Sequence, residues 1–398
     1  MNKSVLFVYP DYHCSFIYRD QLRERGWKAD IYAPDDYPSD LLFDSSCLIK
    51  GFNQKKLCNQ EHLRSNNFIK KRSHQFFWFF DKYFGEFFLL VWYLKTFLRY
   101  KYLIYYSTLD HIQFPIIDSF VRRFTDDNLF RLSLFILKIT RRKIIYLPTG
   151  VSDEEMPEVV AELGEKEVGY VGLDSVERKF HFDTIRRYAR AAIGTGTLNS
   201  TQYKPSHLKW KSLDLNKWNP NLQIPEEFIL PNNNKIRILH SFKYGTERIE
   251  KRGDIKGSYY VKKAIDLLIT EGHEIEYLLF NNVNSRDMRY YQAQADIVIE
   301  QLIRGWWGST GAETMSLGKP VICYLRPSWK KYFFKTFTEY KSLPIIEANK
   351  ENIATVLKEV IENKELRVKK SIESRKFAES FFDPQKNTTH LIEFLSSL

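Results

Sequence analysis

The feature that most restricts the fold of this chain is an alternation of short apolar strands with amphipathic helices. At the start of the sequence, SVLFVYP (4–10), FIYRDQLRERG (16–26) and KADIYAP (28–34) predict a strand, a helix and a strand. Such a βαβ opening is typical of doubly wound α/β folds with a parallel sheet. Further short strands that end near Gly, Ser or Thr are predicted at 102–108, 143–150, 166–172 and 191–196.

A second series of the same kind follows a segment rich in proline and asparagine, which predicts a linker at 216–234. A length of 398 residues suits two domains. We therefore predict an N-terminal Rossmann-like domain at 1–215, a C-terminal Rossmann-like domain at 235–380, and a C-terminal helix at 381–398. A return of this helix to the N-terminal domain is left open. The default position for a site is the cleft between two such domains.

The elements predicted in the second domain are strands at 235–242, 274–283, 295–302, 321–325 and 343–348, and helices at 258–272, 286–294, about 309–317 and, with two breaks, 350–382.

The composition restricts the partners. The net charge of +11 favours anionic partners such as phosphates or an anionic membrane surface. The four cysteines are scattered without the spacing of a zinc site, and the N-terminus resembles a first strand more than a signal peptide. We therefore expect a cytoplasmic protein without a bound metal. Nucleic acid is not expected, because the aromatic residues are not interleaved with Lys and Arg on a recognisable module.

One segment, about 66–101, interrupts the α/β pattern and predicts a helical insertion in the N-terminal domain. It is dense in Phe, Trp and Tyr between Phe76 and Tyr102, and the basic residues Lys70, Lys71 and Arg72 precede it. Charged residues interrupt it too often for a membrane span. Two interpretations remain open: a helix that lies in an anionic membrane interface, or one that packs its aromatic residues on the N-terminal sheet.

The stretch GWWGSTGAETMSLGKPVICYL, 305–325, contains the strongest local pattern. Small residues at 308–311 predict the start of a helix whose first amide groups a ligand can approach closely. Glu313 is predicted on the first turn of this helix, and Gly318 at its end. The candidate anion-binding residues are therefore Gly308, Ser309, Thr310 and Gly311.

Together with ADIVIEQL (295–302) and HSFKYGTERIEKRGDIKG (240–257), this stretch resembles the nucleotide-sugar-binding half of GT-B retaining glycosyltransferases. More narrowly, it resembles the group with an E-x7-E signature. The resemblance extends over about 235–326 and is only topological in the first 215 residues. It implies a GT-B fold, in which two Rossmann-like domains face each other across a cleft.

The resemblance also implies roles for individual residues. Lys256 and Arg252 would hold the donor diphosphate, with Lys251 or Arg248 as alternatives to Arg252 because the spacing varies. Glu313 matches the second signature glutamate, which accepts hydrogen bonds from the ribose hydroxyl groups. His240 and Trp307 are further donor-site candidates, and for Trp307 burial in the core is an equally good interpretation.

The sequence departs from the resemblance at two positions. Gly305 stands where the signature has its first glutamate, and Thr149 stands where a strand-end histidine is expected near the donor sugar. The first departure leaves recognition of the sugar open. The candidates on the acceptor or sugar side, all near predicted strand ends of the N-terminal half, are Tyr12, His13, Asp110, His111, Thr149 and Gly150.

From the resemblance we expect a retaining glycosyltransferase that transfers a sugar from a nucleotide-sugar donor to a glycan or lipid-linked acceptor. Bacterial surface-polysaccharide biosynthesis is the expected setting, at the inner face of the plasma membrane. No Asp-x-Asp triplet occurs, so we expect a metal-independent enzyme without a cofactor. The alternatives left open are a GT-B sugar-nucleotide epimerase or hydrolase and a non-catalytic sugar-nucleotide-binding protein.

Overall fold

The structure is a computed structural model of the chain. It describes residues 3–8, 14–33, 48–50, 90–91, 93–106, 130–147, 162, 164, 184–193, 205–206, 208–241, 254, 256–280, 283–284 and 286–398. By its internal contacts the chain divides into two compact units. The first is Met1–Leu147 with Glu177–Ala192 and Leu398, and the second is Pro148–Val176 with Ile193–Ser397.

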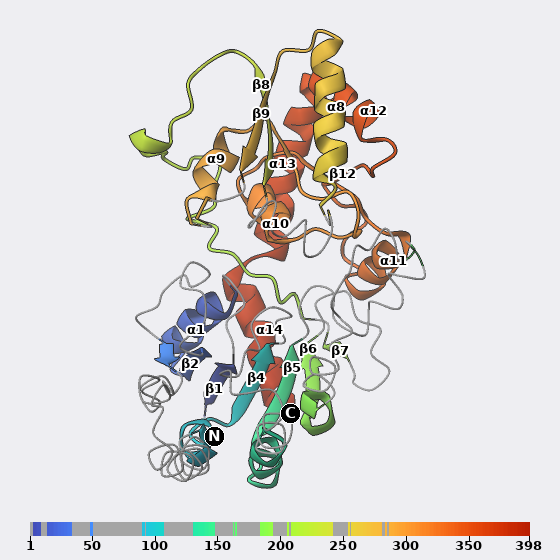
Figure 1. Ribbon diagram of the computed structural model, residues 1–398. Helices are drawn as coiled ribbons and strands as arrows, with labels where there is room; N and C mark the ends of the chain where they lie inside the picture. Colours follow the sequence, from blue (N-terminus) through green and yellow to red (C-terminus); the bar gives the residue numbers. More distant parts are fainter. Residues whose placement is uncertain are drawn as a thin grey trace, which may run out of the picture. The chain divides into compact units, whose positions relative to one another are not determined.

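The strands of the first unit belong to a sheet with the order β3-β2-β1-β4-β5-β6-β7, whose last strand, β7, is counted with the second unit (Figure 1). The strands from β1 to β6 pair in parallel. Their order is that of a doubly wound fold, because the chain moves outward from β1 in both directions. The strands are β1 (Ser4–Val8), β2 (Lys28–Ala33), β3 (Leu48–Lys50), β4 (Tyr102–Tyr106), β5 (Lys143–Leu147), β6 (Ala191–Ile193) and β7 (Pro205–Ser206).

The first βαβ motif forms where the sequence predicts it. Every residue of β1 is buried, as expected for a parallel strand with both faces covered. Helix α1 (Cys14–Glu24) then buries one face, which includes Tyr18 and Leu22. The chain leaves α1 through Gly26, whose φ of +75° favours glycine.

The C-terminal end of the aromatic insertion packs inside the first unit. The rings of Tyr93 and Phe97 stack with centroids 3.7 Å apart, and the ring of Tyr32 from β2 meets Phe97 edge-on at 5.2 Å. The Tyr93 hydroxyl lies 2.7 Å from that of Tyr105 on β4. This end of the insertion therefore packs on the N-terminal sheet, the second of the two interpretations. Residues 76–89 and Trp92 lie outside the described residues. Among the described helices, none is long and apolar enough to cross a membrane.

The second unit contains a five-stranded sheet with the order β12-β11-β10-β8-β9, and all of its strand pairs are parallel. The strands are β8 (Ile236–Ser241), β9 (Ile275–Phe280), β10 (Ile297–Ile299), β11 (Val321–Cys323) and β12 (Ile346–Glu347). The helices are α8 (Ser258–Thr270), α9 (Met288–Gln294), α10 (Ser309–Ser316), α11 (Pro327–Thr336), α12 (Ile353–Glu362), α13 (Lys364–Phe381) and α14 (Pro384–Ser397), and a short 3-10 helix, η5 (Glu226–Phe228), lies in the predicted linker.

Helices cover both faces of this sheet. On one face, α8 and α12 lie side by side (Figure 1) and share a core with β8, β10 and β11. On the other face, α10, α11 and α13 pack on β11 through a cluster rich in aromatic residues. The strand order reverses between β8 and β10, because β9 lies on one side of β8 and all later strands lie on the other. In open α/β sheets, ligands bind at the carboxyl ends of the strands next to such a reversal.

Three details of the second unit differ from the sequence predictions. Glu313 is the fifth residue of α10 and therefore lies in its second turn, not its first. Helix α11 was not predicted, although Pro327 at its first position is a common helix-start signal. The helical region 350–382 has one break, at Asn363, whose side chain caps α13 by accepting from the amide of Leu366.

Candidate active site

Polar side chains meet at the carboxyl ends of β8 and β10, where the strand order reverses. His240 and Ser241 end β8, and Lys256 lies in the connection from β8 to α8. Glu300 follows β10 directly, and its backbone amide donates to the carbonyl of Ile322 on β11. The parallel pairing of β8 with β10 places all four residues at the same edge of the sheet.

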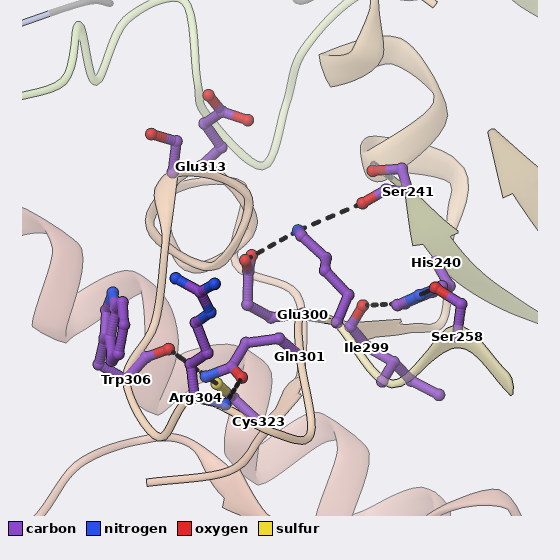
Figure 2. A network of polar contacts seen from close by, with 12 residues as sticks. His240, Ser241, Ser258, Ile299, Glu300, Gln301, Arg304, Trp306, Glu313 and Cys323 are labelled. Carbon is purple, nitrogen blue, oxygen red and sulfur yellow. Dashed lines mark hydrogen bonds and ion pairs between the residues drawn. The ribbon is translucent and has the colours of Figure 1, made fainter. Parts of the chain in front are cut away.

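Lys256 and Glu300 form a buried ion pair at this edge (Figure 2). The Lys256 Nζ donates to Glu300 Oε1 at 3.0 Å and to the carbonyl of Ser241 at 3.3 Å. The Lys256 carbonyl in turn accepts from the amide of Leu302 at 3.0 Å, which holds the two loops together. The lysine side chain is 15% exposed and that of Glu300 is 3% exposed, so the lysine is the more accessible member of the pair.

The second carboxylate oxygen of Glu300 is buried, and among the described residues none donates a hydrogen bond to it. The carboxylate lies against the start of α10. A Cβ atom built on Gly308 would be 2.9 Å from Oε1, and one built on Gly311 would be 3.6 Å from Oε2. Glycine at 308 therefore leaves room for this carboxylate, whereas a Cβ at 311 would first meet the Cβ of Trp307, at 3.0 Å. The sequence predicts that these glycines let a ligand approach the backbone. The atoms closest to them instead belong to side chains of the protein, Glu300 and Trp307.

In the part of the chain that the structure describes, no acceptor pairs with the first backbone amides of α10. Ala312 is the first residue whose amide reaches an acceptor one turn back, the carbonyl of Gly308 at 3.2 Å. Gly308 has no side chain that can cap the helix, and the first turn contains no acidic residue. By contrast, Asp254 caps α8 by accepting from the amides of Ser258 and Tyr259, each at 2.8 Å. The start of α10 is therefore the better place for an exogenous anion.

A second cation lies at the start of α10. The Lys211 Nζ donates to the Ser309 hydroxyl at 2.7 Å. Ser309 is the first residue of α10, so this ammonium group adds positive charge where the helix dipole already favours an anion.

His240 is fully buried and neutral. Its Nδ1 lies 2.9 Å from the carbonyl of Ile299, which can only accept, so Nδ1 carries the proton. Its Nε2 then accepts from the hydroxyl of Ser258 at 2.8 Å. Burial, and secondarily the charge of Lys256, lowers the pKa of His240 from 6.5 to about 4.

Glu313 projects from the side of α10 that faces away from Glu300 (Figure 2). Residues 311 and 313 differ by roughly 200° around a helix, so the two cannot face the same neighbour. The Glu313 carboxylate accepts from the Nε2 of Gln292 on α9 at 3.2 Å, and both side chains are buried. Glu313 is therefore separated from the Lys256–Glu300 pair by the width of the helix.

Comparison with solved structures identifies the fold. No protein-family model matches the sequence, and no curated protein matches it. Among solved structures, HepE of Anabaena in complex with UDP-glucose is 13% identical with a TM-score of 0.51, and the match covers 99% of this chain and 100% of HepE. Its complex with UDP and glucose has a TM-score of 0.53 at 13% identity, with 99% and 100% coverage. Sucrose-phosphate synthase of Thermosynechococcus elongatus has a TM-score of 0.54 at 11% identity, with 99% of this chain and 98% of that chain covered.

The chain has the GT-B fold. This confirms the fold class that the sequence resemblance implied, with two α/β units that each contain a parallel sheet. In this GT-B chain, the loop from Glu300 to Gly308 connects β10 to α10, and Gln301 braces it. The Gln301 Oε1 accepts from the amides of Ile303 at 3.0 Å and Arg304 at 2.6 Å. The Gln301 Nε2 donates to the carbonyl of Trp306.

The structure brings together only some of the predicted site residues. Lys256 and the start of α10 lie at one edge of the sheet, and both nitrogens of the buried His240 ring are engaged by Ile299 and Ser258. Trp307 packs edge-on against Trp329 at 4.8 Å and Phe333 at 5.4 Å, so its ring belongs to the aromatic core next to α10. The predicted candidates that lie outside the described residues are Tyr12, His13, Asp110, His111, Thr149, Gly150 and Arg252, with the alternatives Arg248 and Lys251.

Glu300 is the site residue that the sequence did not single out. The available signal was the polar pair Glu300-Gln301 directly after the apolar strand residues 297–299, since polar residues at strand ends often face a ligand. Among the described residues, no group of three or more His, Cys, Asp or Glu side chains is arranged to hold a metal ion. Metal independence stays an expectation.

Proposed function

We propose that this protein is a glycosyltransferase whose second unit binds a nucleotide-sugar donor at the edge formed by Lys256 and the start of α10. The observation that carries the proposal is the placement of a partly accessible lysine beside a helix start whose first amides have no acceptor among the described residues, at the reversal point of a GT-B sheet. Both groups attract a diphosphate.

This arrangement suits departure of a nucleoside diphosphate. Negative charge grows on the phosphate oxygens as the glycosidic bond breaks, so fixed cations and oriented amides stabilise the transition state more than the ground state. Lys256 is held by Glu300 and by the carbonyl of Ser241, so its ammonium group is positioned before the donor arrives. HepE, which has the same fold, is described in complex with UDP-glucose, and this supports a nucleotide sugar as the donor.

The finer assignment follows the sequence resemblance. The reaction is retaining and metal-independent, and the acceptor is a glycan or lipid-linked sugar of bacterial surface-polysaccharide biosynthesis. A net charge of +11 supports work at an anionic membrane surface. Glu313 binds the ribose of the donor, and Arg252 assists Lys256 at the diphosphate.

A screen of nucleotide sugars by thermal shift tests this proposal. UDP-glucose, UDP-N-acetylglucosamine, GDP-mannose and their nucleoside diphosphates are added with magnesium or with EDTA. At least one sugar nucleotide should raise the melting temperature, equally under both conditions. No shift with any compound would contradict donor binding. Turnover of the bound donor without any acceptor would instead favour an epimerase or hydrolase.

A further inference from the structure

We propose that Glu300 is a specificity-determining residue of the donor site, whose free carboxylate oxygen accepts a hydrogen bond from a hydroxyl group of the sugar carried on the diphosphate. This inference rests on the proposed function. It assigns sugar recognition to a residue five positions before Gly305, where the signature glutamate is missing.

The first support is the incomplete pairing of a buried charge. The Glu300 side chain is 3% exposed, and Lys256 satisfies only Oε1. Oε2 is buried, and none of the described residues donates a hydrogen bond to it. Burial of a carboxylate oxygen without a hydrogen-bond donor costs free energy. A ligand hydroxyl that donates to Oε2 removes this cost.

The second support is the built space around the carboxylate. Gly308, directly before α10, lies against Glu300, and a side chain at 308 would overlap Oε1. On the other side, Lys256 is fixed by the carbonyl of Ser241. The carboxylate is thus held between the ammonium group and the helix start, next to the place where the diphosphate is proposed to bind.

The chemistry of the site selects the ligand group. A carboxylate repels phosphate oxygens, so Oε2 needs an O–H donor that lies next to the diphosphate. Glu313, the proposed ribose partner, projects from the opposite side of α10. The diphosphate links ribose to sugar, so the group on the Glu300 side of the helix is the transferred sugar.

Calorimetry on the full chain tests the inference with three pairs of probes: UDP and UDP-glucose, UDP and UDP-N-acetylglucosamine, GDP and GDP-mannose. The readout is the ratio of the two dissociation constants within a pair. Glu300→Gln should lower the affinity of the nucleotide sugar relative to its nucleoside diphosphate by about tenfold, the value of a charge-assisted hydrogen bond. The nucleoside diphosphate itself should lose less affinity than the nucleotide sugar, because removal of a repulsive charge offsets the looser hold on Lys256.

The matched variant Glu300→Asp keeps the charge beside Lys256 but withdraws the carboxylate by one methylene group. It guards against a folding defect in Glu300→Gln. It should also lower the affinity of the nucleotide sugar relative to that of its nucleoside diphosphate. Equal losses for diphosphate and nucleotide sugar, which leave the ratio unchanged, would mean that Glu300 only orients Lys256, and no loss for either would mean that it does not contact the sugar. Either result overturns the inference and leaves the proposed function intact. Failure of the unaltered protein to bind any probe would overturn both.

Discussion

The Cα of Gly305 lies against the side chain of Arg326. A Cβ atom at 305 would come within 2.3 Å of the Arg326 Cγ and 2.8 Å of its backbone nitrogen. The carbonyl of Gly305 also accepts from the Arg326 amide at 2.8 Å, and the φ of Gly305 is +85°. Position 305 therefore admits no side chain in this conformation. A glutamate at 305 is therefore excluded by the close approach of the backbone to Arg326.

The first prediction concerns Gly305→Ala. The left-handed backbone costs an alanine about 1 kcal/mol or more, and overlap with Arg326 adds about 1–3 kcal/mol. Gly272→Ala is the matched control, because Gly272 has a φ of +96° but nothing within 4 Å of its Cβ position. Urea unfolding should therefore show a clearly larger loss of unfolding free energy for Gly305→Ala. Equal losses would mean that the loop and Arg326 move apart at little cost.

Much of the fold was predictable because it depends on local patterns. The apolar residues 297–299 predict a strand from their own sequence, without information from distant residues. Gly318, with a φ of +65°, ends α10 at the predicted position. The interactions of single side chains were less predictable. Glu300 is buried because Lys256, 44 positions away, neutralises it. Trp307 enters the core because Phe377 and Phe381 of α13 surround it, and no pattern near 307 contains that information.

The second prediction is a pH dependence that depends on His240. Its pKa is about 4 in the folded state and about 6.5 in the unfolded state, so only the unfolded state takes up a proton between these values. The unfolding free energy should therefore fall as the pH falls from about 6.5 toward about 4. Between pH 7 and pH 5 this residue should account for about 2 kcal/mol of the loss, at about 1.4 kcal/mol for each pH unit.

Denaturant unfolding at both pH values checks this. His240→Gln should show a smaller pH dependence than the unaltered protein, whatever its stability at pH 7. His390→Gln, which removes an exposed histidine from α14, is the control for the loss of a histidine. The same pH dependence in the protein with and without His240 would contradict a neutral, buried imidazole.

The third prediction separates a ligand contact of Glu313 from a structural role. Glu313→Gln should weaken UDP binding by roughly 1–3 kcal/mol and weaken 2′-deoxy-UDP binding much less, because the deoxy compound already lacks one hydroxyl donor. Calorimetry with both compounds measures the difference. Glu313 already accepts from Gln292 inside the protein, so a stability loss with no dependence on the 2′-hydroxyl would assign it to the packing of α9 on α10.

The fourth prediction concerns the basic residues before the aromatic insertion. Replacing Lys70, Lys71 and Arg72 with Gln should reduce co-sedimentation with vesicles that contain anionic lipid, and salt should release the unaltered protein. The control replaces the exposed Lys364, Lys369 and Lys376 of α13 and removes the same charge. Equal reductions would indicate that only net charge matters. No vesicle binding at all would favour packing of the whole insertion on the sheet.

The last prediction tests Lys256 as the phosphate ligand. Lys256→Met removes a charge-assisted contact, so it should weaken UDP binding about tenfold or more and leave uridine binding unchanged. Lys262→Met on α8, which removes an exposed lysine paired with Asp266, is the control and should leave both affinities unchanged. Lys256→Met also leaves Glu300 buried without its partner, which typically costs about 3–5 kcal/mol of stability. The double variant Lys256→Met with Glu300→Gln removes that unpaired charge, so it should regain stability without regaining UDP affinity. If UDP affinity returns together with stability, the loss in the single variant came from misfolding, and the diphosphate binds elsewhere.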